Sequence, residues 1–224
     1  MRLIPPLLAA ALAACGAADG GGETPNAAGL VSLPCDRSES LAPLEPRYCR
    51  NRHFLTPEAR SVMIATARAL AERHPGAVIH FMDGSGPNGV KPFAPHLSHG
   101  DGRQLDVALF FETSQGEPLA APPDTSSHGG WWPAEPPRDG ERIACPQGRT
   151  GAADKPDPPP DRQWRLDEVR TRALIEILVE NPGVRRILIE PHLEERLGFW
   201  GHPKLRFAGC QAARHDDHLH IDFH

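Results

Sequence analysis

A long segment whose composition disfavours helices and strands divides this chain and limits what it can fold into. Between Glu112 and Gln163 the sequence is rich in proline, glycine and polar residues, with the runs HGGWWP (128–133) and PDPPPD (156–161) inside it. Proline has no backbone N–H to donate, so helices and sheet strands are disfavoured here. A loop of this length in a compact domain is usually functional or disordered. We therefore expect a long loop over 112–163, with the regular structure on either side of it.

The flanking segments carry the periodic patterns of helices and strands. Thr56-Pro57-Glu58 combines a capping hydroxyl, a first-turn proline and a carboxylate, which predicts a helix from here to Arg73. In HLHIDF (218–223) apolar and polar residues alternate, as in a strand with one buried face. Further strands are predicted within 77–82, 102–111 and 184–190, and a second helix over 164–180 with Leu166, Val169, Ala173 and Ile177 on one stripe. Helices and strands are segregated rather than strictly alternating, so we expect an α+β fold with a mostly antiparallel sheet flanked by helices.

The N-terminus has the pattern of a bacterial export signal. MRLIPPLLAAALAAC has one arginine and then an apolar run too short to span a bilayer, so residues 1–14 are expected to be a signal peptide. The end of this run resembles the lipobox of bacterial lipoproteins, which implies acylation of Cys15 and a lipid anchor as the only membrane contact. The alternative is an ordinary signal peptide with a chance cysteine. The Gly- and Ala-rich residues 16–34 predict a flexible tether, followed by a folded domain over 35–224 in the periplasm.

The cysteines that remain after Cys15 point to disulfide bonds. They are Cys35, Cys49, Cys145 and Cys210. An even number in an exported protein predicts two disulfides, with three possible pairings. We favour Cys35–Cys49 with Cys145–Cys210, because the first pair closes a short local loop. No Cys-x-x-Cys occurs, so neither a cysteine zinc site nor a thioredoxin-like dithiol is supported.

Charge and the absence of several motifs exclude other classes of function. The formal net charge is -5 and no basic cluster occurs, so no nucleic-acid partner is expected. His-Glu-x-x-His is absent, which excludes a zincin helix, and the Gly-x-Ser-x-Gly spacing of a nucleophile elbow is absent as well. Asp83 follows a predicted strand and precedes a glycine; a turn role is favoured, with a place in a cleft as the alternative.

Histidines gather in two segments that lie far apart in the sequence. In PHLSHGDGRQLDV (95–107), His96 and His99 precede Asp106 near the start of a predicted strand. In the closing strand His218 and His220 must point the same way, because side chains alternate between the two faces of a strand. Neutral imidazoles with one carboxylate, and one position left for water, are the ligands of a catalytic zinc ion. Each segment alone is a weak signal for metal binding.

Together the two segments resemble a known family of zinc enzymes. Ser98-His99-x-x-Gly102-x-x-x-Asp106, followed by His218-x-His220, is similar to metallopeptidases related to lysostaphin, D-Ala-D-Ala carboxypeptidases and the hedgehog signalling domain. The pattern most resembles penicillin-insensitive murein endopeptidases, through His96 and through a His-x-x-His-x-His ending that begins at His215. The resemblance covers roughly 57–111 and 164–223, and the long loop contributes nothing to it.

The resemblance implies a metal site and a fold. It implies a hedgehog-like and D,D-peptidase-like α+β fold with the site on the sheet, and one Zn²⁺ held by His99, Asp106 and His220, with water in the fourth position. His218 would be the general base, and His215 would assist it.

Several assignments near this site stay open. His96 would be an auxiliary residue near the metal. Carboxypeptidase relatives carry a glutamate at the position of Asp217, which makes Asp217 an alternative base, although His218 is favoured. Asp216, Asp217 or Glu190 could fix the tautomer of a histidine.

The implied activity is a zinc-dependent peptidoglycan hydrolase that cleaves peptide crosslinks at D-amino-acid bonds. Its partners would be the peptide stems of peptidoglycan, and its oligomeric state is undetermined by the sequence. Two alternatives remain: a D,D-carboxypeptidase with the same zinc site, and a non-catalytic zinc protein that binds the cell wall.

Overall fold

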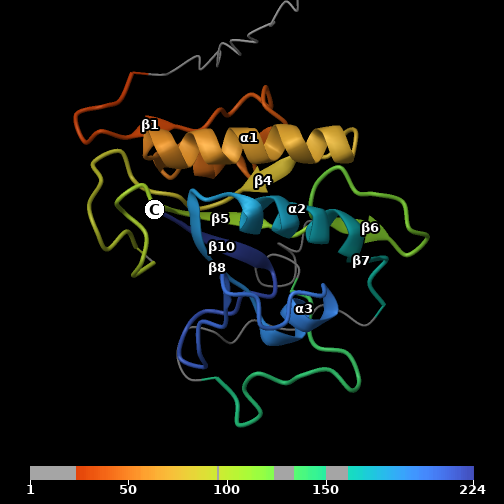
Figure 1. The fold of residues 1–224 in the computed structure, drawn as a ribbon. Coiled ribbons are helices and arrows are strands. Elements are labelled where there is room, and N and C mark those ends of the chain that lie inside the picture. The colour runs from red at the N-terminus through yellow and green to blue at the C-terminus, as the bar shows by residue number, and fades with distance from the viewer. Residues whose placement is uncertain (1–23, 95, 124–133, 150–160) are drawn as a thin grey trace, which may run out of the picture.

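A computed structural model describes residues 24–94, 96–123, 134–149 and 161–224 of this chain (Figure 1). The expected signal peptide over 1–14 and Cys15 lie outside the described residues. The elements are β1 (Val31–Ser32), β2 (Leu41–Pro43), a 3-10 helix (Pro46–Cys49), β3 (Phe54–Leu55), α1 (Pro57–Arg73), β4 (Ile79–Phe81), β5 (Gln104–Ala108), β6 (Phe111–Thr113), β7 (Trp164–Leu166), α2 (Glu168–Glu180), β8 (Val184–Leu188), α3 (Pro191–Arg196), β9 (Leu205–Arg206) and β10 (His218–Phe223). The α+β class is confirmed.

The main sheet is mixed, so the expectation of a mostly antiparallel sheet is wrong. Its six strands follow the order β2-β4-β5-β10-β8-β9. The central pairings β4–β5, β5–β10 and β10–β8 are antiparallel, but β2–β4 and β8–β9 are parallel. A parallel pair requires a crossover connection, and α1 and α3 provide these crossovers. Periodicity within each strand gives no information on this direction of pairing.

One face of the sheet is apolar and packs against the helices. Leu105 and Val107 on β5, and Leu219 and Ile221 on β10, are fully buried. The helices α1 and α2 pack against each other beside the sheet (Figure 1). Because side chains alternate along a strand, the polar residues of β5 and β10 point to the opposite face. The expected closing strand at 218–223 is confirmed.

Both long helices begin at a side-chain cap. α1 starts as expected, with Thr56 accepting a hydrogen bond from the Ala59 amide at 3.2 Å. α2 starts at Glu168, not at residue 164, because the Asp167 carboxylate caps it and residues 164–166 form β7 instead. The predicted stripe of α2 is also wrong in part, since Val169 is 67% exposed.

The N-terminal segment pairs with the fold, and the described cysteines form disulfides. The described part of the expected tether, residues 24–34, includes β1, which pairs with β3, so ordered structure begins before Cys35. The disulfides Cys35–Cys49 and Cys145–Cys210 are both present, which confirms the favoured pairing. Disulfides are typical of oxidising compartments. Within the described ranges, no helix combines the length and apolarity needed to cross a membrane.

Candidate metal centre

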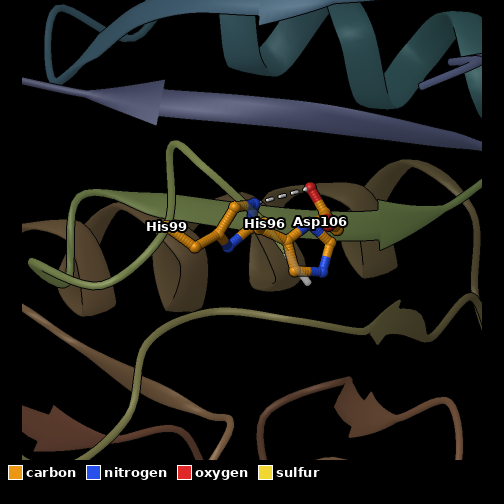
Figure 2. Close-up of side chains that lie close together, drawn as sticks. All are labelled: His96, His99 and Asp106. Atoms are coloured by element: carbon orange, nitrogen blue, oxygen red, sulfur yellow. Dashed lines mark ion pairs between the residues drawn. The ribbon is translucent and has the colours of Figure 1, made fainter. Parts of the chain in front are cut away.

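The two histidine segments meet on the polar face of the two central strands. His220 on β10 lies directly opposite Asp106 on β5 in the antiparallel pairing, so their side chains share one face. Figure 2 shows His96, His99 and Asp106 in front of β5, with α1 behind the strand. The loop before β5 therefore brings His96 and His99 back over Asp106, on the face that the helices do not cover.

Three donor atoms form a tight triangle. His99 Nε2 is 3.1 Å from His220 Nδ1 and 3.3 Å from Asp106 Oδ1, and His220 Nδ1 is 2.8 Å from Asp106 Oδ1. Tetrahedral zinc with bonds of about 2.0–2.1 Å places its ligand atoms about 3.3 Å apart. The spacing of the donors of His99, Asp106 and His220 thus fits a small four-coordinate ion.

His96 gives a second, wider set of donors. The donor atoms of His96, His99 and Asp106 lie within 4.8 Å of one another, so this group could hold a metal ion. His96 Nδ1 is 3.8 Å from Asp106 Oδ2, farther than any separation in the first triangle. We take the tighter triangle as the better metal site, with His96 beside its open side, since His96 is half-buried whereas His99 is completely buried.

One ring nitrogen of His99 and one of His220 face the triangle, and the surroundings of the other nitrogen differ between the two rings. His99 Nδ1 donates to the Gly84 carbonyl at 2.8 Å, because a carbonyl can only accept. In a neutral His99 ring, Nε2 is therefore the nitrogen with a lone pair, and it faces Asp106. On His220 the other ring nitrogen, Nε2, is buried and makes no hydrogen bond to the described residues; it lies 3.7 Å from Asp222 Oδ1, and Asp222 accepts a 2.6 Å hydrogen bond from Arg186. A carboxylate behind a ligating imidazole is the usual outer partner in metal sites.

Burial and neighbouring polar groups have opposite effects on the pKa values of Asp106 and His220. Burial opposes ionisation of Asp106, but His99 and His218 beside it outweigh this effect and hold its pKa well below its usual range. Burial lowers the pKa of His220, yet its hydrogen bond to Asp106 and the nearby carboxylate of Asp222 outweigh this effect and raise this pKa to about 9. Asp106 is therefore ionised and ready to bind a cation, which would displace the proton from His220.

His218 stands next to the triangle with its base nitrogen free. Its Nδ1 donates to Asp217 Oδ1 at 2.6 Å, and its Nε2 is 3.8 Å from Asp106 Oδ1. Asp217 therefore fixes the tautomer of His218. Of the two candidate bases, His218 is the one that presents a lone pair toward the metal donors.

His215 lies beside these imidazoles and is held through its backbone. Its ring centroid is 5.0 Å from that of His218 and 5.9 Å from that of His220. Burial holds the pKa of His215 well below its usual range, so the ring is neutral. Glu190 accepts a hydrogen bond from the His215 amide, not from a ring nitrogen, and Asp216 pairs with Arg214. Of the three carboxylates considered, Asp217 is thus the one seen bound to an imidazole.

Of three outer partners near the site, the sequence predicted neither Arg52 nor Asp222, and a place in a cleft was only the alternative for Asp83. Asp83, for which a turn role was favoured, accepts a 2.8 Å hydrogen bond from His96 Nε2 and pairs with Arg52. Arg52 carries no sequence signal, because its link to Asp83 arises only when distant loops meet. Asp222 could have been found, since the alternation in 218–223 places it on the face of His220.

Comparisons of the sequence with protein-family models and with curated proteins found no match for this chain.

Proposed function

We propose that this protein is a zinc-dependent peptidase that cleaves peptides of peptidoglycan at D-amino-acid bonds, in the manner of murein endopeptidases. The observation that carries the proposal is the donor triangle of His99, Asp106 and His220 with His218 Nε2 beside it. Two imidazole nitrogens and one carboxylate oxygen are a zinc-type ligand set, and three protein ligands leave one position for water.

The chemistry of the bound ion complements the residues around it. Zinc, when bound, lowers the pKa of a coordinated water to about 7 and polarises a carbonyl oxygen. His99 and His220 would hold the ion with neutral nitrogens, and Asp106 would supply the negative charge. The Gly84 carbonyl keeps the His99 imidazole oriented through its hydrogen bond, and the Asp222 carboxylate lies 3.7 Å from the outer nitrogen of His220.

The proton transfers belong to His218. Its Nδ1 proton is held by Asp217, so its Nε2 can take a proton from the attacking water and return it to the departing amine. Ionised Asp217 stabilises the positive charge that His218 gains in between. His96 is half-buried and donates a hydrogen bond to Asp83, and it would help to orient the water or the substrate.

The substrate class rests on the motif resemblance and on the expected export. The two disulfides are consistent with an oxidising compartment such as the periplasm, where peptidoglycan peptides would be within reach of a lipid-anchored enzyme. A D,D-carboxypeptidase would use the same donors, because terminal and internal bonds differ in how the substrate-binding cleft ends and not in the metal chemistry.

One set of variants tests this function. Purified protein should contain one zinc per chain by elemental analysis and should cleave crosslinked muropeptides. His218→Ala should retain zinc and lose cleavage by at least about 100-fold, whereas His220→Ala should lose both. His224→Ala, at an exposed position beyond β10, is the control and should behave as the native protein.

The products distinguish the alternatives. Cleavage of pentapeptide muropeptides in place of crosslinked ones would indicate a D,D-carboxypeptidase. Native protein that binds zinc and muropeptides, but cleaves neither the crosslinked nor the pentapeptide form, would indicate a binding protein. Protein that binds no metal, or full activity in His220→Ala, would refute the proposal.

A further inference from the structure

Glu190 occupies the N-cap position of α3 but does not cap the helix with its side chain. Its carboxylate turns the other way and accepts a 3.1 Å hydrogen bond from the His215 amide. The Glu190 amide in turn donates to the His215 carbonyl at 3.2 Å. Both backbone polar groups of His215 are therefore tied to this one residue.

Arg149 completes this contact from the long loop. Its Nη2 lies 2.5 Å from Glu190 Oε2, and its guanidinium carbon is 5.6 Å from the centroid of the Phe207 ring. The side chains of Arg149 and Glu190 are only 12% and 2% exposed. Burial raises the pKa of Glu190, while the His215 amide and Arg149 oppose that change. A buried carboxylate of this kind is costly unless it is paired, so Arg149 compensates for the burial of Glu190.

The long loop holds the same turn at a second point. The Glu135 amide donates to the Asp216 carbonyl at 2.8 Å, next to His215. The Glu135 carboxylate is itself fixed by Arg196 and Arg162 at 2.8 and 2.9 Å. Two described parts of the loop, around Glu135 and Arg149, thus reach the turn that leads into β10.

We propose that Arg149 and Glu190 are positioning residues that hold the His215 backbone, and through it the imidazoles of the metal centre. The inference rests on the proposed function and adds the long loop to it. The His215 ring contacts the His218 ring, and His218 Nε2 lies 3.8 Å from Asp106. A shift of about 1 Å in a catalytic group can cost about 100-fold in rate, so anchoring the residue at the start of this chain of contacts matters for the proton transfer.

Two substitutions of Glu190 distinguish a positioning role from an effect of charge: one removes the carboxylate, and the other replaces it with an amide. Glu190→Ala removes the acceptor for the His215 amide and should lower kcat by about 10- to 100-fold, with KM within about 2-fold of native. Glu190→Gln keeps an oxygen that can accept from this amide and should retain kcat within about 5-fold. Arg149→Met should fall between them. Bound zinc should stay at one per chain in all three variants, because none of them touches the donor triangle.

A second readout does not depend on cleavage. Hydrogen exchange of the His215 amide, followed by NMR on the protein as purified, should be at least about 10-fold faster in Glu190→Ala than in native protein, because this amide loses its acceptor. Exchange in Glu190→Gln should stay near the native rate. If Glu190→Ala left both the exchange rate and kcat unchanged, the positioning role would be refuted. If native protein cleaved no muropeptide, the proposed function would fail while the exchange rates still decided the positioning role.

Arg170→Met is the matched control for a purely structural effect. Arg170 forms another buried ion pair, 2.5 Å from Asp167 at the start of α2, with side chains 9% and 5% exposed. This variant should lose stability as Arg149→Met does, while kcat and the exchange of the His215 amide stay native at temperatures well below unfolding. An equal loss of kcat in Arg170→Met would show that lost stability accounts for the effect, and would overturn the proposal.

Discussion

One hydrogen bond decides which nitrogen of His218 can accept a proton. Asp217 Oδ1 holds the Nδ1 proton at 2.6 Å and leaves Nε2 facing Asp106. Asp217→Asn removes the charge that fixes this tautomer and stabilises the protonated ring. We expect kcat on muropeptides to fall by about 100-fold with zinc content unchanged.

Asp217→Glu is the conservative comparison for this variant. A glutamate keeps the negative charge, so it should recover part of the lost rate if orientation of His218 is the role of Asp217. Equal activity in native protein and Asp217→Asn would show instead that the tautomer of His218 is set by another group.

His80 on β4 links the stability of the fold to pH. Burial is the main cause that lowers its pKa from the usual 6.5 to about 4, with smaller effects of Arg37 and Arg170. The fold therefore favours neutral His80, and the unfolded chain takes up the proton first. The contribution of His80 to the free energy of unfolding should be fully present above about pH 6.5. It should fall by about 3 kcal/mol as the pH drops toward 4.

Denaturant unfolding across this pH range isolates the contribution of His80. In His80→Leu the free energy of unfolding should fall less steeply between pH 6.5 and 4 than in native protein. His224→Leu, at an exposed position, should keep the native slope. Equal slopes in native protein and His80→Leu would contradict the assignment.

At the scale of elements, α1 shows how a short sequence signal sets a boundary. The Thr56 hydroxyl satisfies the Ala59 amide at 3.2 Å, so Thr56→Ala should lower the free energy of unfolding by about 1 kcal/mol. Ser61→Ala, an exposed hydroxyl inside the same helix, should change it by less than half of that. Urea titrations of the two variants make the comparison, and equal losses would mean that the Thr56 cap adds nothing to the helix.

The elements also show where sequence patterns stop being informative. Thr56 and the alternation in 218–223 predicted α1 and β10, because a cap and a period of two are local properties. Residues 164–166 also resembled the start of a helix, yet they form β7 by pairing with β6, a partner more than 50 residues away. The parallel pairings at the sheet edges depend in the same way on crossovers and not on the strands themselves.

The same division holds for the metal centre. The strand pattern predicted that His218 and His220 share a face, and the motif resemblance added His99 and Asp106. Arg52, Asp83 and Glu190 contact partners from loops distant in the sequence, so the partner of each is found only in the tertiary structure.

At the scale of the whole molecule, the two disulfides differ in what they hold together. Cys35–Cys49 joins residues 14 apart near the start of the fold, whereas Cys145–Cys210 joins residues 65 apart and links the long loop to the segment before His215. Closing loops of these lengths removes entropy from the unfolded chain worth about 3 and about 4 kcal/mol. Replacing either pair with alanine should therefore lower the free energy of unfolding by a comparable amount.

Their effects on activity should differ, because the second disulfide lies only four residues from Arg149. Removing Cys145 and Cys210 loosens the part of the loop that carries Arg149 to Glu190, so kcat should fall several-fold and exchange of the His215 amide should accelerate. Removing Cys35 and Cys49 should leave both at native values. Measurements at a temperature where both double variants are fully folded separate this effect from stability. If the two variants lost kcat equally, or if neither did, the loop around Arg149 would hold the metal centre no more firmly than the rest of the fold does.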